Sequence, residues 1–421
     1  MRKITRIVSY LLTILVTMIV TGWSVSNWLP GFLSIPVKYI AVGFTEDMIR
    51  VKDAFLKKSM YEVSNDIDYN ELPHDIFSID YYLDWSYNEN DTFFVERFSL
   101  ASNELVERSY FTPEFVRSKL HPYSFRQDGN EIISKSSVTV RPKHFLFTEE
   151  GIVFNFKYGP LICAYNSDSV IWENHDFTFH HSIEKDHEGN LWACGLERIF
   201  EPTPKDYPYD ALPFYIVKVD GRTGRTLMSI SLIDILEAND LNYMLNWKAL
   251  QKGLFDYHHL NDIQPVLADN KFAQKGDLIL SLRELNTILV YRPSTNRVLF
   301  HKNNISYAQH DVDIVNDSCI SIFSNNSYIK SSTERKNNSL EIYNFTSGET
   351  YTYQKEITDR YKINTWHQGL CEIVDDQTFM IDETEAGVVY VVHNDQVNTF
   401  YKLQSENTAS LTNWSRLTKI D

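Results

Sequence analysis

The sequence predicts an all-β fold, a six-bladed β-propeller that follows an N-terminal transmembrane helix. Three observations support it: one hairpin pattern occurs six times, three histidines stand at similar places before strands, and an uncharged apolar run lies near the N-terminus. Aromatic residues are frequent among the 421 residues (25 Tyr, 25 Phe and 8 Trp), and such residues favour sheet over helix. Hydrophobic residues make up 43% of the chain, which is enough for a large core.

The N-terminal segment is predicted to be a membrane anchor. Three basic residues precede an uncharged run from 7 to 37, whose apolar part, 7–25, has about the 20 residues that a spanning helix needs. Basic residues before a helix keep that end in the cytoplasm. A cleaved signal peptide is the alternative, but the run offers only a poor cleavage site. We therefore expect residues 1–37 to hold the protein in the inner (cytoplasmic) membrane as a single-pass anchor, with the propeller on the periplasmic side.

The rest of the chain is predicted to be a short linker and one large domain. In residues 38–75, apolar residues recur partly at helical spacing, which predicts a helical linker. Residues 76–421 are expected to form the propeller. Its hairpin copies alternate apolar and polar residues, turn through Asn, Asp, Ser or Gly, and return as a second alternating strand. They begin at Phe94, Ile162, Ile216, Ile288, Leu340 and Val389.

The spacing of these hairpins favours a propeller over other β folds. Successive copies begin roughly 50 to 70 residues apart, which suits four-stranded blades with a few insertions. A β-sandwich with irregular hairpins is the alternative, but a sandwich would not repeat a histidine-bearing strand and a hairpin in fixed order. One insertion, residues 231–255, has apolar residues at helical spacing. The predicted helix would either cover the mouth of the central channel or pack on the rim of the propeller.

Charge and cysteine content exclude some classes of function. The net charge is -16, and no basic face is visible, so nucleic-acid binding is not expected. The four cysteines lie at strand-like positions without metal-binding spacing, and we interpret them as core thiols with no predicted disulfide. They are Cys163, Cys194, Cys319 and Cys371.

Three histidines and one arginine are expected to form a site. His181, His259 and His310 each stand at the start of a strand that continues into a hairpin partner. The innermost strand of each propeller blade lines the central channel, so equivalent residues of different blades point toward one another. Arg283 lies on the strand that follows His259 and is expected at the end that meets the channel. Three imidazoles and a guanidinium would make a cationic, donor-rich pocket suited to a small oxyanion.

Short motifs around these residues resemble one protein family. The resemblance runs from about His180 to about Val392, with three motifs in fixed order. On these motifs the sequence resembles the bacterial arylsulfotransferases, also called arylsulfate sulfotransferases. The motifs are a His-His pair before a Gly-Asn turn (His180, His181, Gly189, Asn190), His-x-Asn followed by Ser-x-Arg (His259, Asn261, Ser281, Arg283), and Gln-His-Asp before a strand ending in Phe-Ser-Asn (Gln309, His310, Asp311, 323–325).

The resemblance implies a fold, a reaction and site residues. Members of the family are six-bladed propellers that move a sulfuryl group from a phenolic sulfate ester to a phenol, through a sulfated histidine and without a nucleotide donor. The sulfated histidine corresponds to His310, and the other catalytic residues correspond to His181, His259 and Arg283. The implied partners are an aryl sulfate donor and a phenolic acceptor, and neither a cofactor nor a metal is implied.

The physical chemistry of the motif residues agrees with these roles. His310 must be neutral to attack sulfur, and nearby positive charge lowers the pKa of an imidazole. A protonated His181 or His259 could give a proton to the departing phenolate, and the sequence leaves this choice open. Asn261, His180 and His258 are expected to contribute to substrate binding. Because neighbouring residues of a strand point to opposite faces, His180 and His258 should point away from His181 and His259 and be packed or supporting residues rather than reactants.

Two other classes of function remain as alternatives. Propellers can bind iron or zinc through several histidines, and neutral imidazole is a common metal ligand. Arg283 argues against this metal-enzyme hypothesis, because a fixed cation beside a divalent metal ion is unfavourable. The second alternative is a non-catalytic, membrane-anchored propeller scaffold. Metal analysis distinguishes the first alternative, and a sulfuryl-transfer assay distinguishes the second.

Overall fold

The structure is a computed structural model that describes most of the chain beyond Asp66. The predicted anchor, 1–37, and the linker residues 38–66 lie outside the described residues. Among the residues described, no helix is long and apolar enough to cross a membrane. The described ranges are 67–90, 92–119, 126–127, 130–131, 142–156, 159–197, 214–245, 258–327, 337–405 and 408–420.

Residues 67–421 form one compact unit. Its first segment, 67–75, was expected to be part of a helical linker, but it packs on the strands of the unit. The 3-10 helix η1 (Tyr69–Glu71) begins this segment, and Tyr69 is buried with its hydroxyl donating to the carbonyl of Ala386 at 2.9 Å. The β unit therefore includes residues before the predicted boundary at 76.

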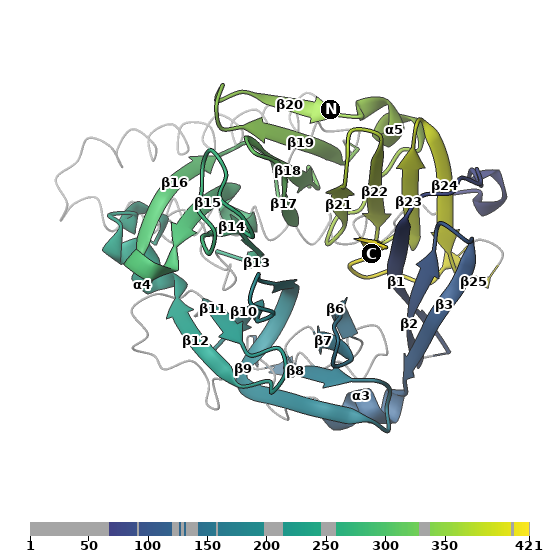
Figure 1. Ribbon diagram of the computed structural model, residues 1–421, viewed down its shortest axis with the longest axis horizontal. Helices are drawn as coiled ribbons and strands as arrows, with labels where there is room; N and C mark the ends of the chain where they lie inside the picture. The colour runs from purple at the N-terminus through teal and green to yellow at the C-terminus, as the bar shows by residue number, and fades with distance from the viewer. Residues whose placement is uncertain are drawn as a thin grey trace, which may run out of the picture. The chain divides into compact units, whose positions relative to one another are not determined.

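Antiparallel sheets account for most of this unit. Four sheets have four strands each and a fifth has seven, and Figure 1 shows them arranged in a ring. The chain closes the ring, because the C-terminal strand β27 pairs with β1. The four-stranded sheets are β27 (Arg416–Lys419), β1 (Tyr81–Glu89), β2 (Thr92–Ser99) and β3 (Glu104–Phe111); β13 (Leu260–Pro265), β14 (Leu278–Leu282), β15 (Thr287–Arg292) and β16 (Arg297–Asn303); β17 (Asp311–Asn316), β18 (Cys319–Ser324), β19 (Ser339–Asn344) and β20 (Thr350–Tyr353); and β21 (Leu370–Ile373), β22 (Thr378–Glu383), β23 (Val388–His393) and β24 (Gln396–Tyr401).

The seven-stranded sheet departs from the expected pattern of separate blades. Its long strand β9 (Val170–Lys185) pairs with β8 through its first part and with β10 through its last part. The all-β, propeller-like fold is confirmed, whereas six separate four-stranded sheets are found only in part. The other strands of this sheet are β6 (Pro142–Phe147), β7 (Ile152–Phe156), β8 (Gly159–Ala164), β10 (Leu191–Leu196), β11 (Phe214–Val219) and β12 (Thr226–Ser231), and two short pairs complete the described strands: β4 (Arg126–Gln127) with β5 (Asn130–Glu131), and β25 (Leu403–Ser405) with β26 (Thr408–Ala409).

All six predicted hairpins are present, as the pairs β2/β3, β8/β9, β11/β12, β15/β16, β19/β20 and β23/β24. Apolar side chains from neighbouring sheets pack together between them. In one cluster, Ile279 and Val290 of one sheet pack with Val312 and Ile320 of the next. The four cysteines are buried, as expected of core thiols, and their thiols are free in the structure.

Short helices connect some of the strands. The helix expected within 231–255 is present as α4 (Leu232–Ala238), followed by η2 (Asn242–Met244); residues 246–257 lie outside the described part. The buried face of α4 joins a core cluster with residues of β11 and β15, and Figure 1 places it beside β16, toward the rim. This supports the rim interpretation for α4. The remaining described helices are α3 (Pro113–Lys119), α5 (Lys355–Arg360), η4 (Arg283–Leu285) and η5 (Pro293–Thr295).

Side-chain bonds between inner strands fix the sheets against one another near the histidines. The hydroxyl of Ser182 accepts from the backbone N–H of Ile263 at 3.0 Å. In the same way, Asp262 accepts from Val312 at 2.8 Å. Asp311 continues the pattern by accepting from Cys371 at 3.0 Å. Each acceptor follows a site histidine by one to three residues, so these bonds set the distances between the histidines.

Candidate active site

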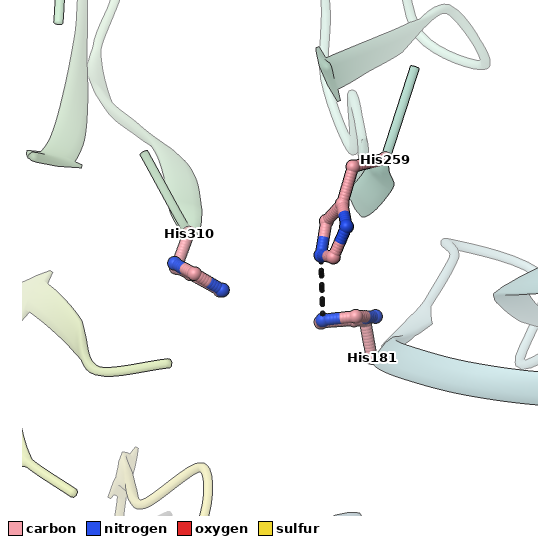
Figure 2. Close-up of side chains that lie close together, drawn as sticks. All are labelled: His181, His259 and His310. Atoms are coloured by element: carbon pink, nitrogen blue, oxygen red, sulfur yellow. Dashed lines mark hydrogen bonds between the residues drawn. The ribbon is translucent and has the colours of Figure 1, made fainter. Parts of the chain in front are cut away.

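Three inner strands bring His181, His259 and His310 together, as the sequence predicts. Figure 2 shows their imidazoles directed toward one another from three separate strands. One ring nitrogen from each histidine lies within 4.8 Å of those of the other two, and the Nε2 atoms of His181 and His259 are 3.3 Å apart. The ring centroid of His310 is 5.9 Å from that of His181 and 6.1 Å from that of His259. The space between the ring of His310 and the other two rings is called the gap of the site.

Two of the three histidines have a left-handed backbone conformation. The φ angle is 54° at His181 and 46° at His259, a region that non-glycine residues adopt at a cost of about 1 to 3 kcal/mol. Polar contacts hold both positions. The side-chain amide of Asn155 donates to the carbonyl of His181 at 2.8 Å, and the backbone N–H of Arg283 donates to the carbonyl of His259 at 3.1 Å. These turns direct both imidazoles into the site instead of along the sheet.

The side chain of Asn325 determines which nitrogen of His310 carries the hydrogen. The amide nitrogen of Asn325 donates to the carbonyls of Gln368 (2.7 Å) and Thr365 (3.1 Å), which fixes the orientation of the amide. Its oxygen therefore faces Nδ1 of His310, 2.6 Å away, and must accept a hydrogen from it. Neutral His310 then has its lone pair on Nε2, the nitrogen that Figure 2 shows directed toward the other two histidines.

Arg283 is placed beside the histidines by the end of β14. It begins η4, is 4% exposed, and forms an ion pair with its neighbour Glu284. Its charge acts on His310 and helps to lower the pKa of that imidazole. The predicted proximity of Arg283 to the histidines is thus found, whereas its acidic partner was not anticipated.

Burial and nearby positive charge favour the neutral forms of His310 and His181. Burial is the main cause that lowers the pKa of His310 well below its ordinary value, and Arg283 and His259 add to it. The pKa of His181 is lowered by burial first and then by the neighbouring His259 and His180. Neutral imidazoles at neutral pH fit both a nucleophile and a metal ligand.

Comparison with known proteins identifies the family. The family model described as Arylsulfotransferase (ASST) matches residues 143–402, more than half of the sequence. The chain belongs to the arylsulfotransferase family. The match includes all four residues of the predicted catalytic set, His181, His259, Arg283 and His310. It confirms the resemblance drawn from the motifs and assigns the chain to a family of transferases.

Solved structures are similar to the chain only at the level of the fold. A protein of unknown function from Bacteroides caccae is 11% identical, with a TM-score of 0.44, covering 79% of this chain and 98% of its own. The Pan2 WD40 domain of Neurospora crassa is 10% identical, with a TM-score of 0.39, covering 85% of this chain and 91% of its own. No curated protein matches the sequence significantly.

The predicted substrate-binding residues of this family member are buried. His180, His258 and Asn261 are 2%, 1% and 0% exposed. The amide of Asn261 donates to the carbonyl of Gln309 at 2.7 Å, so it positions the residue before His310. Their role in substrate binding stays a prediction.

The expectation that His180 and His181 point to opposite faces is wrong. Nδ1 of His180 lies 2.6 Å from Nδ1 of His181. The cause is a bulge: Ala193 and Cys194 are neighbours on β10, but they pair with Ile183 and His180 on β9. The two extra residues break the alternation and turn His181 back toward its neighbour.

Sequence reasoning missed one histidine that lies beside the predicted set. His144 lies in β6, with its ring centroid 5.6 Å from that of His181 and 4.2 Å from that of Trp414. It is 2% exposed, and burial lowers its pKa, as does the adjacent Lys143. The signal was available, because three apolar residues (145–147) follow His144 directly, just as strand residues follow His310. However, the sequence did not reveal the hairpin register that is needed to compare the two positions.

Proposed function

We propose that the protein transfers a sulfuryl group from a phenolic sulfate ester to a phenol, and that His310 carries the group between the two. The observation that carries this proposal is the convergence of His310 with His181 and His259 beside Arg283, in a member of the arylsulfotransferase family. The buried asparagine behind His310 adds support, because it holds the lone pair of Nε2 on the side of the other histidines.

The first displacement loads the histidine. The lone pair on Nε2 of His310 forms a bond to sulfur while the bond between sulfur and the ester oxygen breaks. The departing phenolate takes a proton that the opposite imidazole pair, His181 and His259, has taken up together with the donor, and it leaves as a phenol. The lowered pKa of His310 supports this role, because a protonated imidazole has no lone pair at Nε2.

The second displacement transfers the sulfuryl group from His310 to the acceptor. A phenolic acceptor enters the vacated place, gives its proton to the same imidazole pair, and attacks sulfur. The N–S bond to His310 breaks and the lone pair returns to Nε2. Neither step needs an oxidant, a reductant or a nucleotide, and the overall reaction exchanges one phenol for another.

Arg283 is proposed to stabilise the charge that develops on the sulfuryl oxygens. A planar guanidinium presents donors in a fixed arrangement that suits oxyanions, and in a buried site such a donor is effective because little solvent screens it. Glu284 pairs with it and orients the guanidinium. The fixed positive charge of Arg283 also favours entry of an anionic donor.

A metal enzyme is the second candidate, because the distance between one ring nitrogen of His181 and one of His259 suits two ligands of a zinc ion. Two ligands on a tetrahedral zinc ion with Zn–N bonds of about 2.0 to 2.1 Å are separated by about 3.3 to 3.4 Å. The Nε2 atoms of His181 and His259 are 3.3 Å apart. The nearby charge of Arg283 opposes a dication at this place, so sulfuryl transfer remains the preferred proposal. Metal analysis of the purified protein separates the two.

We further propose a six-bladed propeller held at a membrane. Dividing the seven-stranded sheet at β9, which serves one unit with its first half and the next with its last half, yields six four-stranded units. The anchor proposal rests on the apolar run within residues 1–37 and its basic flank, which would place the propeller on the periplasmic side. A reporter enzyme fused after Asp421 should be active only in the exported compartment, and activity in the cytoplasm would overturn this topology.

A direct assay tests the proposed activity. The full-length protein, purified in detergent, is mixed with 4-nitrophenyl sulfate, with and without phenol. Sulfuryl transfer predicts release of nitrophenol that depends on added phenol, with phenyl sulfate as the second product. The absence of phenyl sulfate under all donor and acceptor combinations would leave the non-catalytic scaffold as the better explanation.

A further inference from the structure

The site contains a row of three imidazoles that the proposed reaction does not fully use. His180, His181 and His259 are joined by two nitrogen–nitrogen contacts: Nδ1 to Nδ1 at 2.6 Å, and Nε2 to Nε2 at 3.3 Å. His181 is the middle member and uses both of its ring nitrogens. Each contact requires one hydrogen, because two lone pairs or two N–H groups at this distance repel each other.

The contact between His180 and His181 depends on an unfavourable backbone conformation. His181 is left-handed and lies in the bulge of β9, which brings its Nδ1 to His180. His180 is 2% exposed, and its ring packs against Phe214 of β11, 5.4 Å between centroids. The second ring nitrogen of His181, Nε2, faces the gap opposite His310 (Figure 2). One nitrogen of His181 therefore serves a buried partner and the other serves the site.

The charged and titratable groups around His181 oppose its protonation in the empty site. They are His259, His180, His144 and His310, and with burial they lower the pKa of His181. A bound sulfate ester brings one negative charge into the gap, which favours the protonated form. A proton is thus expected to enter with the donor. The imidazolium of His181 would then donate from Nδ1 to His180 and from Nε2 to the ester oxygen.

We propose that His181 is the acid and base of the reaction and that His180 is its positioning residue, sharing the charge of the His181 imidazolium through the Nδ1 contact. This inference rests on the proposed sulfuryl transfer. In the first displacement the proton on Nε2 of His181 passes to the departing oxygen, and His181 stays neutral with its hydrogen on Nδ1. In the second, Nε2 takes the proton of the acceptor phenol, which later returns to solvent. One proton is taken up with the donor and one is released with the product.

The test compares donors whose phenols differ in acidity. A nitrophenolate leaves without protonation, whereas an unsubstituted phenolate needs the proton. His180→Phe keeps a ring beside Phe214 and removes both nitrogens, while His180→Asn keeps one acceptor. For the donor half-reaction, we expect His180→Phe to lose about 10²-fold with phenyl sulfate but only a few-fold with 4-nitrophenyl sulfate. His180→Asn should recover part of the loss.

The outcomes of this test distinguish the two proposals. An equal loss with both donors would mean a structural role for His180 and would overturn the inference, as would unchanged rates with both. If the phenylalanine variant does not fold, the asparagine variant gives the same comparison. Absence of turnover by the unchanged protein with any donor would overturn the proposed function itself. Turnover by the unchanged protein with a donor-independent loss in the variants would overturn only the role of His180.

Discussion

Replacing Asn325 by alanine should separate the chemistry of His310 from the stability of its surroundings. The side chain of Asn325 accepts from His310 and donates to the carbonyls of Thr365 and Gln368. A hydrogen bond contributes about 1 kcal/mol net, so the loss of three should lower the free energy of unfolding by roughly 3 kcal/mol. Without this acceptor, His310 is no longer held with its hydrogen on Nδ1, and its lone pair is less often at Nε2.

The effect on catalysis should be larger than the effect on stability. Changing the group that fixes the tautomer of a catalytic imidazole costs on the order of 10⁴-fold in rate in a serine protease, so we expect a loss of roughly 10²- to 10⁴-fold for Asn325→Ala. Asn338→Ala is a matched control. Its side chain donates to the carbonyls of Asn325 and Thr365 and accepts from the N–H of Thr365, but it makes no bond to His310. This control should lose a similar stability and keep most of its activity.

Both quantities can be measured on the same samples. The burst of nitrophenol from 4-nitrophenyl sulfate without acceptor reports the donor half-reaction, and thermal unfolding reports stability. The reasoning predicts that the two variants unfold at similar temperatures and differ strongly in burst rate. If Asn325→Ala is as active as Asn338→Ala, the hydrogen bond from Nδ1 does not determine the reactivity of His310, and the tautomer argument is refuted.

Three further predictions test the role of Arg283, the effect of one buried carboxyl on stability, and the metal-enzyme alternative. Arg283→Lys keeps the charge but loses the planar donor arrangement, so turnover should fall about 10- to 100-fold with little change in unfolding temperature; full activity would make the guanidinium structural. Burial raises the pKa of Glu383 to about 7, so between about pH 4.5 and pH 7 its carboxyl stays protonated in the folded protein while it ionises in the unfolded chain, and above pH 7 the folded protein carries the full cost of the buried charge. Glu383→Gln should therefore raise the free energy of unfolding by up to about 3 kcal/mol at pH 8 and by almost nothing at pH 4, and an equal gain at both pH values would contradict this origin. Dialysis against a chelator should leave sulfuryl transfer unchanged, whereas loss of activity that zinc restores would favour the metal enzyme.

Much of the fold could be predicted because its signals are local. Alternating residues and turn residues define each hairpin, and all six hairpins are found. The long strand β9 could not be predicted from the repeat, because the sequence offers no marker of where one sheet ends and the next begins. The start of the compact unit at Ile67 was missed for a similar reason, since Tyr69 is buried through contacts with Ala386, far along the chain.

The reacting residues of the candidate site could be predicted from the sequence, but the residues that hold them in place could not. His259 and His310 stand directly before strands and His181 lies within β9, and equivalent strands of a propeller meet at its centre. Asn325 follows His310 by 15 residues, and only the pairing of β17 with β18 brings their side chains together. The contact between His180 and His181 depends on the bulge in β9, which reverses the expectation from alternation.

Mass spectrometry of the loaded protein tests the central claim most directly. After a brief mixture with an aryl sulfate and no acceptor, at neutral or alkaline pH, the peptide that contains His310 should carry one sulfuryl group. His310→Asn should lose both this adduct and turnover, and His181→Asn should load more slowly, still on His310. A sulfuryl group on His181 or His259 instead would mean that the wrong residue is assigned as the nucleophile. Full activity of His310→Asn would contradict the mechanism.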